Sequence, residues 1–135
     1  MVKVIGWFQG VVGVGMVGLW VVLLAAGEVP EIPAGQRAIW FHIGAEVITG
    51  ALLIIAGWTL LRRGDARSRL LSAFALGALL YTVVNSPGYY ADRGAWALVV
   101  VFIVLALCAA AAFVRLLRPA SAAASSAPVA RREPV

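Results

Sequence analysis

Charged residues are scarce in this sequence. Asp, Glu, Lys and Arg together make up 13% of the 135 residues, whereas soluble globular domains average roughly one quarter. Hydrophobic residues make up 63% of the chain, and the mean hydropathy is +0.97. This composition excludes an ordinary soluble domain and predicts an integral membrane protein, with the lipid bilayer as its main partner.

Residues that bind metals or carry redox chemistry are also scarce. The single cysteine, Cys108, permits no intrachain disulfide and no CxxC pair, and His42 is the only histidine. One histidine, one nearby glutamate and a distant cysteine fall short of the three or four protein ligands of a zinc site. We therefore predict no metal and no cofactor in a single chain; a metal or haem site would need a dimer.

The sequence also lacks residues spaced as a catalytic group and a basic surface that could bind nucleic acid. No nucleophile and base stand in a recognisable catalytic arrangement, so we assign no catalytic residue and keep an acid-base enzyme only as a minor alternative. The net charge of +5 would indicate nucleic acid only if basic residues clustered on a water-facing surface with interleaved aromatics. They flank apolar segments instead, so no nucleic-acid partner is predicted.

What the sequence does contain is four long apolar runs separated by short polar segments. A membrane-spanning helix needs about 20 predominantly apolar residues. The pattern predicts an all-α integral membrane protein, an antiparallel four-transmembrane-helix bundle over residues 1–118, with helices at 4–26, 38–61, 67–86 and 95–117. Residues 119–135 are mostly alanine, serine, proline and arginine, so we predict a disordered cytoplasmic tail.

The third apolar run is the shortest, and its outer end carries residues that break helices. Pro87 and Gly88 follow Asn85 and Ser86. Because proline and glycine commonly end a helix, we predict that the third helix stops before Pro87 and that residues 86–93 form a loop.

The basic residues divide unevenly between the two ends of these helices. Short loops rich in arginine and lysine remain on the cytoplasmic side. Nine basic residues fall on one side, and only Arg37 and Arg93 fall on the other. The nine are Lys3, Arg62, Arg63, Arg67, Arg69, Arg115, Arg118, Arg131 and Arg132. We predict a multi-pass protein of the plasma membrane with both termini in the cytoplasm.

Small residues in the first and third helices indicate close helix packing. Gly6 and Gly10 have the GxxxG spacing that lets another backbone approach closely, and Gly13 follows them. Gly77 should let the second and third helices approach each other. We therefore predict that Gly6, Gly10, Gly13 and Gly77 serve helix packing, within the chain or in a homo-oligomer or larger membrane complex.

The second helix carries the polar residues with the strongest functional signal. His42 and Glu46 are four residues apart, so they stack on one face of a helix, and Thr49 continues the same stripe. An ionisable group inside a membrane span is costly and indicates a functional site. Burial also disfavours a charged carboxylate, so we expect a proton on Glu46 to be exchangeable.

The third helix is expected to supply the partners of Glu46. Tyr81 and Asn85 are four residues apart and share a face of the third helix. Counted from Asn85 at the outer end, Tyr81 lies at a depth similar to that of His42 if neighbouring helices are antiparallel. We predict that Tyr81 or Asn85 donates a hydrogen bond to the carboxyl group of Glu46.

Two functional interpretations follow from this cluster. In the first, His42, Glu46, Thr49, Tyr81 and Asn85 form an outer-leaflet polar pocket for proton-linked binding or transport of an unidentified small molecule. In the second, the protein is a structural or accessory membrane subunit, and the cluster only locks helix packing through interhelical hydrogen bonds. A transporter with so few helices would need an oligomer to achieve alternating access.

The layout of four helices with short loops and an HxxxE stripe in the second helix resembles the small DoxX-like membrane proteins. The resemblance covers Val4 to Arg118 at the level of layout. It implies a four-helix membrane fold and no particular activity, because no diagnostic motif matches residue by residue.

Overall fold

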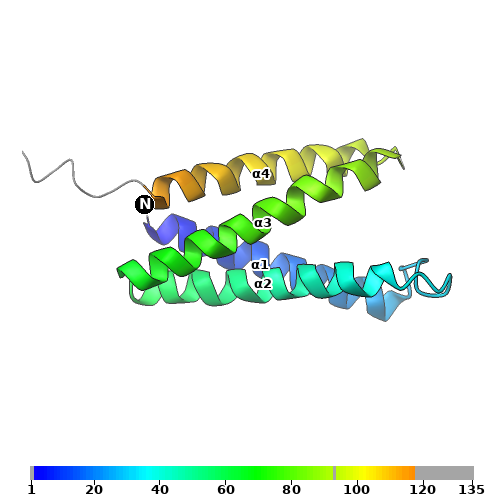
Figure 1. The fold of residues 1–135 in the computed structure, drawn as a ribbon, viewed down its shortest axis with the longest axis horizontal. Coiled ribbons are helices and arrows are strands. Elements are labelled where there is room, and N and C mark those ends of the chain that lie inside the picture. The colour runs from blue at the N-terminus through cyan, green and yellow to red at the C-terminus, as the bar shows by residue number, and fades with distance from the viewer. Residues whose placement is uncertain (1, 93, 118–135) are drawn as a thin grey trace, which may run out of the picture.

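The chain folds into four long helices joined by short connections. The computed structural model describes residues 2–92 and 94–117, without the side-chain environment of residue 89, so the predicted tail at 119–135 lies outside the described residues. The helices are α1 (Val2–Ala26), α2 (Ala38–Arg62), α3 (Ala66–Asp92) and α4 (Trp96–Leu117), and they run alternately up and down (Figure 1). Each is long and apolar enough to cross a membrane, and the described residues contain no strand.

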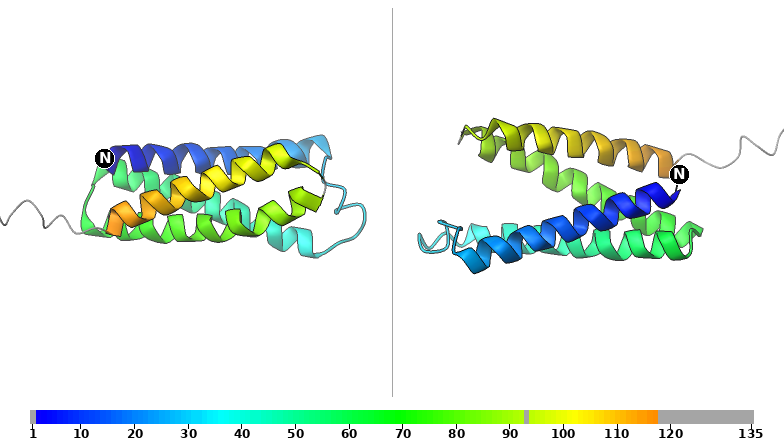
Figure 2. Two further views of the ribbon diagram at one scale, coloured as in Figure 1. Left: turned by 90° about the horizontal axis from the view of Figure 1, so that it is seen from above. Right: turned by 180° about the vertical axis from the view of Figure 1, so that it is seen from behind.

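The helices pair as two sequential hairpins. The most extensive packing is between α1 and α2 and between α3 and α4, with a smaller contact between α2 and α3 and a slight one between α1 and α3. The two hairpins meet at the end that holds the N-terminus and diverge toward the 27–37 connection (Figures 1 and 2). The polar residues at the start of α2 and near the end of α3 therefore lie where the hairpins are furthest apart.

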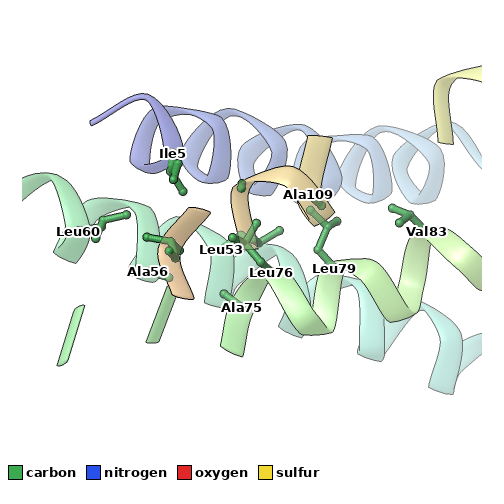
Figure 3. Packing of buried hydrophobic residues seen from close by; sticks show 11 residues of the cluster. Ile5, Leu53, Ala56, Leu60, Ala75, Leu76, Leu79, Val83 and Ala109 are labelled. Carbon is green, nitrogen blue, oxygen red and sulfur yellow. The ribbon is translucent and has the colours of Figure 1, made fainter. Parts of the chain in front are cut away.

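The core lies where the two hairpins meet. It is made of small and aliphatic side chains from all four helices, with α2, α3 and α4 contributing every buried member except Ile5 (Figure 3). The buried members are Ile5, Leu53, Ala56, Leu60, Ala75, Leu76, Leu79, Val83, Ala109, Ala112 and Leu116. Because alanine at these positions leaves little side-chain volume to separate the helices, they can approach closely.

Glycines bring α1 and α2 into backbone contact. A Cβ atom at Gly13 would lie 2.5 Å from the carbonyl oxygen of Gly50, and one at Gly57 would lie 2.5 Å from the carbonyl oxygen of Gly6. Real Cβ atoms do not approach backbone this closely, so a side chain at these positions would force the helices apart. Gly6 and Gly13 therefore do pack helices, with Gly50 and Gly57 as their counterparts on α2.

At the other two positions predicted to serve helix packing, no contact within the chain requires glycine. A Cβ atom at Gly10 or at Gly77 would meet no atom within 4 Å. The backbone nitrogen of Gly10 would lie 3.0 Å from a Cβ atom at Gly57, so Gly10 is at the contact of α1 with α2, but its own Cβ direction faces open space. On α3 the close approach to α2 occurs at Ser72, whose hydroxyl donates to the carbonyl of Ala56 at 3.3 Å, and this corrects the prediction for Gly77.

The predicted end of the third helix is wrong, because α3 passes through Pro87 and continues to Asp92. Proline removes one backbone hydrogen bond, but helices of this kind tolerate it when nearby hydroxyl groups and neighbouring helices compensate. The carbonyl that loses its donor is that of Val83, whereas the hydroxyl of Ser86 donates at 3.0 Å to the neighbouring carbonyl of Thr82. In the last turn, Tyr90 stacks on Phe102 of α4 with ring centroids 5.3 Å apart.

The signal that ends α3 is Gly94 rather than Pro87. Gly94 has a φ of +71°, and its N–H donates to the carbonyl of Ala91 at 2.9 Å. The N–H of Ala95 donates to the carbonyl of Tyr90 at 2.9 Å. These two bonds form a Schellman motif, which satisfies the last carbonyls of a helix and favours glycine at the left-handed position.

Candidate functional site

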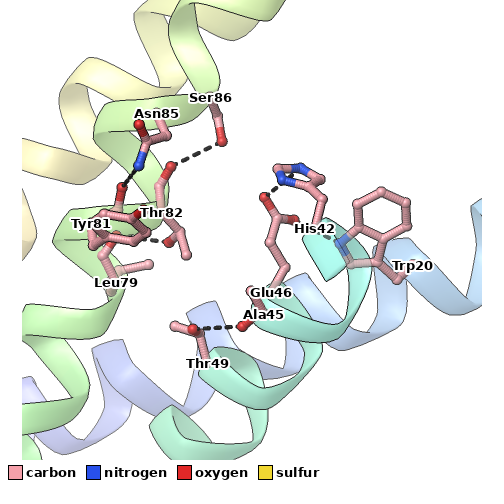
Figure 4. Close-up of polar contacts among 10 residues, drawn as sticks. All are labelled: Trp20, His42, Ala45, Glu46, Thr49, Leu79, Tyr81, Thr82, Asn85 and Ser86. Atoms are coloured by element: carbon pink, nitrogen blue, oxygen red, sulfur yellow. Dashed lines mark hydrogen bonds and ion pairs between the residues drawn. The ribbon is translucent and has the colours of Figure 1, made fainter. Parts of the chain in front are cut away.

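The carboxyl group of Glu46 is held by one residue from each helix of the first hairpin. Trp20 of α1 donates its indole N–H to Oε2 of Glu46 at 2.6 Å. On the other side, Nε2 of His42 lies 3.3 Å from Oε1 of Glu46, one turn away on α2. The rings of Trp20 and His42 also meet edge to face, with centroids 6.0 Å apart. Figure 4 shows the three side chains together, and we call these three residues the Glu46 triad.

The two carboxyl oxygens of Glu46 have partners with different hydrogen-bonding capacity. An indole N–H can only donate, so Oε2 of Glu46 always accepts. His42 can donate or accept through Nε2, so the second contact holds in two ways: a carboxylic acid donates to neutral histidine, or a carboxylate accepts from Nε2–H. The Trp20 bond thus leaves Oε1 of Glu46 as the carboxyl oxygen that faces Nε2 of His42.

The three side chains of the triad differ in how far each is exposed at the surface of the protein. Trp20 is buried, with 9% of its surface exposed, whereas the exposed fraction of the side chain is 15% for Glu46 and 51% for His42. The buried end belongs to a small apolar cluster in which Trp20 packs with Ile43 and with Val29 of the 27–37 connection. His42 is therefore the open end of the triad and Trp20 its closed end.

Thr49 lies on the expected stripe but not in the triad. Its side chain is buried, and its hydroxyl donates to the carbonyl of Ala45 at 2.8 Å. A hydroxyl bonded to the preceding turn of its own helix is a common arrangement for threonine in an apolar helix. The hydroxyl of Thr49 therefore has its hydrogen bond within α2 and makes none to the triad.

The structure does not bring Tyr81 and Asn85 to Glu46. Tyr81 is 74% exposed, and the amide of exposed Asn85 donates to the carbonyl of Tyr81 at 3.0 Å. The buried face of α3 carries Leu79 and Val83 instead, and residue 81 falls on the opposite side of a helix with that face inward. This corrects the prediction of a hydrogen bond from either residue to Glu46.

The groups that α3 presents toward α2 are different ones. The hydroxyl groups of Thr82 and Ser86 lie on the side of α3 that faces His42 and Glu46 (Figure 4). Further along the same face, the phenol of Tyr90 lies within electrostatic range of the carboxyl groups of Glu46 and Glu31. Tyr90 reaches this position because α3 continues past Pro87.

Two of these residues, Trp20 and Tyr90, were missed by the sequence prediction, although one signal was available. Trp20 and Glu46 lie at similar distances along the chain from the middle of the 27–37 connection, so an antiparallel hairpin places them at similar depth. No comparable signal identified Tyr90, because its position depends on how α3 passes Pro87.

Two surface pockets lie away from the triad. One, of about 520 Å³, runs between α1 and α2 and includes Trp7, Gly10 and Arg62. The other, of about 450 Å³, includes Arg67 and Phe74 of α3. Neither contains a residue of the Glu46 triad. Within residues 2–92 and 94–117, no group of three or more His, Cys, Asp or Glu residues could hold a metal ion.

Comparison with known proteins gives a family without a known activity. A family model described as a domain of unknown function, DUF8058, matches residues 1–127. No curated protein and no solved structure matches the chain, so the resemblance to DoxX-like proteins stays a prediction. Because the match extends over nearly the whole sequence, this chain belongs to the DUF8058 family.

Proposed function

We propose that this protein is a multi-pass protein of the plasma membrane with both termini in the cytoplasm. Four helices of sufficient length and hydropathy support the membrane location. The division of nine basic residues against two supports the orientation. On this proposal, the Glu46 triad lies in the outer half of the membrane and the 63–65 connection lies on the cytoplasmic side.

The orientation is tested with single cysteines at Glu31 and Asp65, each placed in a Cys108→Ser background. In intact cells, a membrane-impermeant thiol reagent should label the cysteine at 31 and not the one at 65. After permeabilisation both should react. Labelling of position 65 alone in intact cells would reverse the proposed orientation.

Within the membrane, the proposed function is proton-linked binding or transport of a small molecule at the Glu46 triad. The observation that carries this proposal is the asymmetric hydrogen bonding of the carboxyl group, with Trp20 at 2.6 Å on one oxygen and half-exposed His42 at 3.3 Å on the other. A proton between Glu46 and His42 is accessible through the histidine, while the tryptophan side is sealed. The resemblance to DoxX-like proteins agrees with this architecture and adds no activity.

Glu46→Gln is the sharpest test of a proton-exchanging site. The glutamine carbonyl can accept from Trp20 and its amide can donate to His42, so both hydrogen bonds survive while the titratable group is lost. The variant should fold as the wild type does but fail to restore the phenotype of a deletion strain. Glu28→Gln, in the exposed connection, is the matched control and should restore it.

A direct measurement of proton exchange complements the phenotype. The infrared difference spectrum between alkaline and acidic buffer should contain a carboxyl C=O band that disappears in Glu46→Gln and shifts in His42→Gln. A carboxyl band unaltered by both substitutions would contradict exchange at this site.

The second candidate function is that of a structural or accessory subunit in which the triad only locks the first hairpin. The bond between Trp20 and Glu46 favours it, because this bond joins α1 to α2 inside an apolar cluster. On this interpretation, Glu46→Gln keeps both stability and phenotype. Glu46→Leu leaves the Trp20 N–H without its acceptor and should destabilise the protein by about 1 to 3 kcal/mol.

A further inference from the structure

An open groove runs between α1 and α2 near the N-terminal end of α1. It has a volume of about 520 Å³, and its lining is apolar except at one end. Trp7 and Val14 of α1 form one wall, and Ile54 and Trp58 of α2 form the other. Both tryptophans are more than half exposed. In the view from behind, α1 is the helix nearest the reader (Figure 2, right).

Gly10 forms part of the groove floor, and its lack of a side chain keeps the groove open. A Cβ atom at Gly10 would meet nothing within 4 Å, so glycine is not required there for contact with α2. By contrast, Gly6, one turn away, would place a Cβ atom 2.7 Å from Leu61. The two glycines of the GxxxG pair therefore have different roles: Gly6 lets α1 pack on α2, and Gly10 keeps the groove open.

One end of the groove is basic. Arg62, the last residue of α2, lines the groove, and its guanidinium lies over the ring of Trp58, 4.3 Å from the ring centroid. Stacking on an aromatic ring holds an arginine in place and leaves its N–H groups free for an anion in the ring plane. Lys3, near the start of α1, is exposed at the same end of the hairpin.

We propose that this groove binds an anionic phospholipid of the leaflet in contact with the 63–65 connection. One acyl chain lies over Gly10 between the two tryptophans, and the phosphate is bound by Arg62. An apolar channel that ends in a fixed guanidinium matches the two halves of such a lipid, and basic side chains between helices are a recognised form of headgroup binding. The proposal rests on the proposed membrane location and is independent of the Glu46 triad.

Charge argues against a second copy of this chain as the occupant. Copies of one protein share a single orientation in a membrane, so two grooves facing each other would bring their basic ends together. Arg62 and Lys3 of one copy would then lie near the same residues of the other, and like charges repel. An anionic lipid instead supplies the opposite charge.

Binding is measured on the full chain in a mild detergent by native mass spectrometry. The probes are phosphatidylglycerol and phosphatidylcholine with identical acyl chains, which differ in net charge. Both lipids carry a phosphate, but the choline ammonium cancels the net charge of phosphatidylcholine, so phosphatidylglycerol should bind the basic end of the groove about tenfold more tightly. Excess inorganic phosphate should not displace it, because the acyl chain supplies part of the affinity.

Two substitutions separate the headgroup contact from the acyl contact. Arg62→Gln should lower the affinity for phosphatidylglycerol about tenfold and lower that for phosphatidylcholine less, so that the preference between the two lipids shrinks. Gly10→Leu fills the groove and should weaken both lipids. The matched controls are Arg115→Gln, which removes a basic residue from the last turn of α4, and Gly15→Leu, which adds the same side chain to open space elsewhere on α1.

Each outcome decides the proposal. Val14→Phe narrows the groove from an exposed position, and it should reproduce the effect of Gly10→Leu if that variant folds poorly. Equal binding of the two lipids by the wild type, or unchanged binding in both groove-filling variants, would overturn the lipid assignment. A wild-type dimer that becomes monomeric in Gly10→Leu while lipid binding persists would show that a second copy occupies the groove.

Discussion

The α1–α2 hairpin and the α3–α4 hairpin are closed by different kinds of contact. In the first, backbone lies against backbone, because Gly13 faces Gly50 and Gly6 faces Gly57. In the second, side chains fill the space, as in the stack of Tyr90 on Phe102, while the two glycines of α3, Gly77 and Gly88, would each place a Cβ atom in open space. In the α1–α2 hairpin a larger residue at these glycines would clash with backbone, whereas in the α3–α4 hairpin the side chains can repack around a substitution.

The hydrogen bonds of the polar side chains also differ between the two hairpins. The Glu46 triad lies wholly within the first hairpin, where a rigid glycine contact fixes the distance between Trp20 and Glu46. In the second hairpin, hydroxyl and amide groups such as Thr82 and Asn85 bond to carbonyls of their own helix. Close backbone approach thus gives α1 and α2 a fixed geometry in which a carboxyl group can be positioned between helices.

The largest effect is expected from a substitution at the glycine contact between α1 and α2. Gly13→Val places a side chain 2.5 Å from the carbonyl of Gly50, and backbone cannot move aside cheaply, so we expect a loss of about 3 kcal/mol or more. The measurement is reversible unfolding in detergent. Gly15→Val and Gly77→Val, both into open space, should each cost far less, and equal losses at the three positions would remove the distinction between the hairpins.

Trp20→Phe tests whether the triad contributes to the first hairpin. Phenylalanine keeps an aromatic ring but leaves Oε2 of Glu46 without its donor, so stability should fall by about 1 to 3 kcal/mol. The same unfolding measurement applies. Trp96→Phe, at an indole that is 65% exposed, is the control and should be nearly neutral; a matching loss there would indicate a general effect of removing tryptophan.

Gln9 tests the polar link between the two hairpins. Its side chain is fully buried, and Nε2 donates to the carbonyl of Ser72 at 2.9 Å, while Oε1 has no partner among the described residues. Gln9→Leu removes the bond together with the unpaired oxygen, so stability should change by less than about 1 kcal/mol. Gln9→Ala leaves a cavity and should cost about 2 kcal/mol or more. The reverse order would mean that the hydrogen bond, not the packing, holds α1 to α3.

The smallest effect is expected at the connection between the hairpins. The Ser68 N–H donates to Oδ1 of Asp65 at 2.8 Å and caps α3. This bond, together with the Ser68 hydroxyl, lowers the pKa of Asp65 below the usual 3.8. A lowered pKa means that the capping contribution is present above about pH 4 and is lost as the pH falls through the value in the folded protein.

The comparison of Asp65→Ala with the wild type across pH tests this sign. The two proteins should differ slightly in stability at neutral pH and converge in acid. A difference that grows on acidification would contradict the capping role. Asp92→Ala, at the other end of α3, is the matched control and should not reproduce the convergence.

Several features of the fold could be predicted from the sequence. The four apolar runs gave the number of helices and bounds within two residues for α1, α2 and α4. The prediction failed at the outer end of α3 because it took Pro87 as a terminator. Proline removes only one hydrogen bond near a helix end, whereas Gly94 supplies the left-handed turn that actually ends the helix.

The site was predictable only in part. His42 and Glu46 follow from their spacing on one helix, and the structure places them 3.3 Å apart. Their partners did not follow, since Tyr81 and Asn85 turn outward and Trp20 supplies the second bond to Glu46. Glycines seven residues apart on both helices, at 6 and 13 and at 50 and 57, were an available sign of how α1 and α2 meet.

The sequence by itself determined that four apolar helices form, and that one of them carries a histidine and a carboxylate a turn apart, because both depend on local composition and helical periodicity. Only the tertiary structure decided which face each helix turns inward. A helix that is apolar on all sides gives hydropathy no face to distinguish, so its rotation is set by packing against its neighbours. That packing, closest at Gly13 and Gly50, made Trp20 the partner of Glu46 and left Gly10 open beside Arg62.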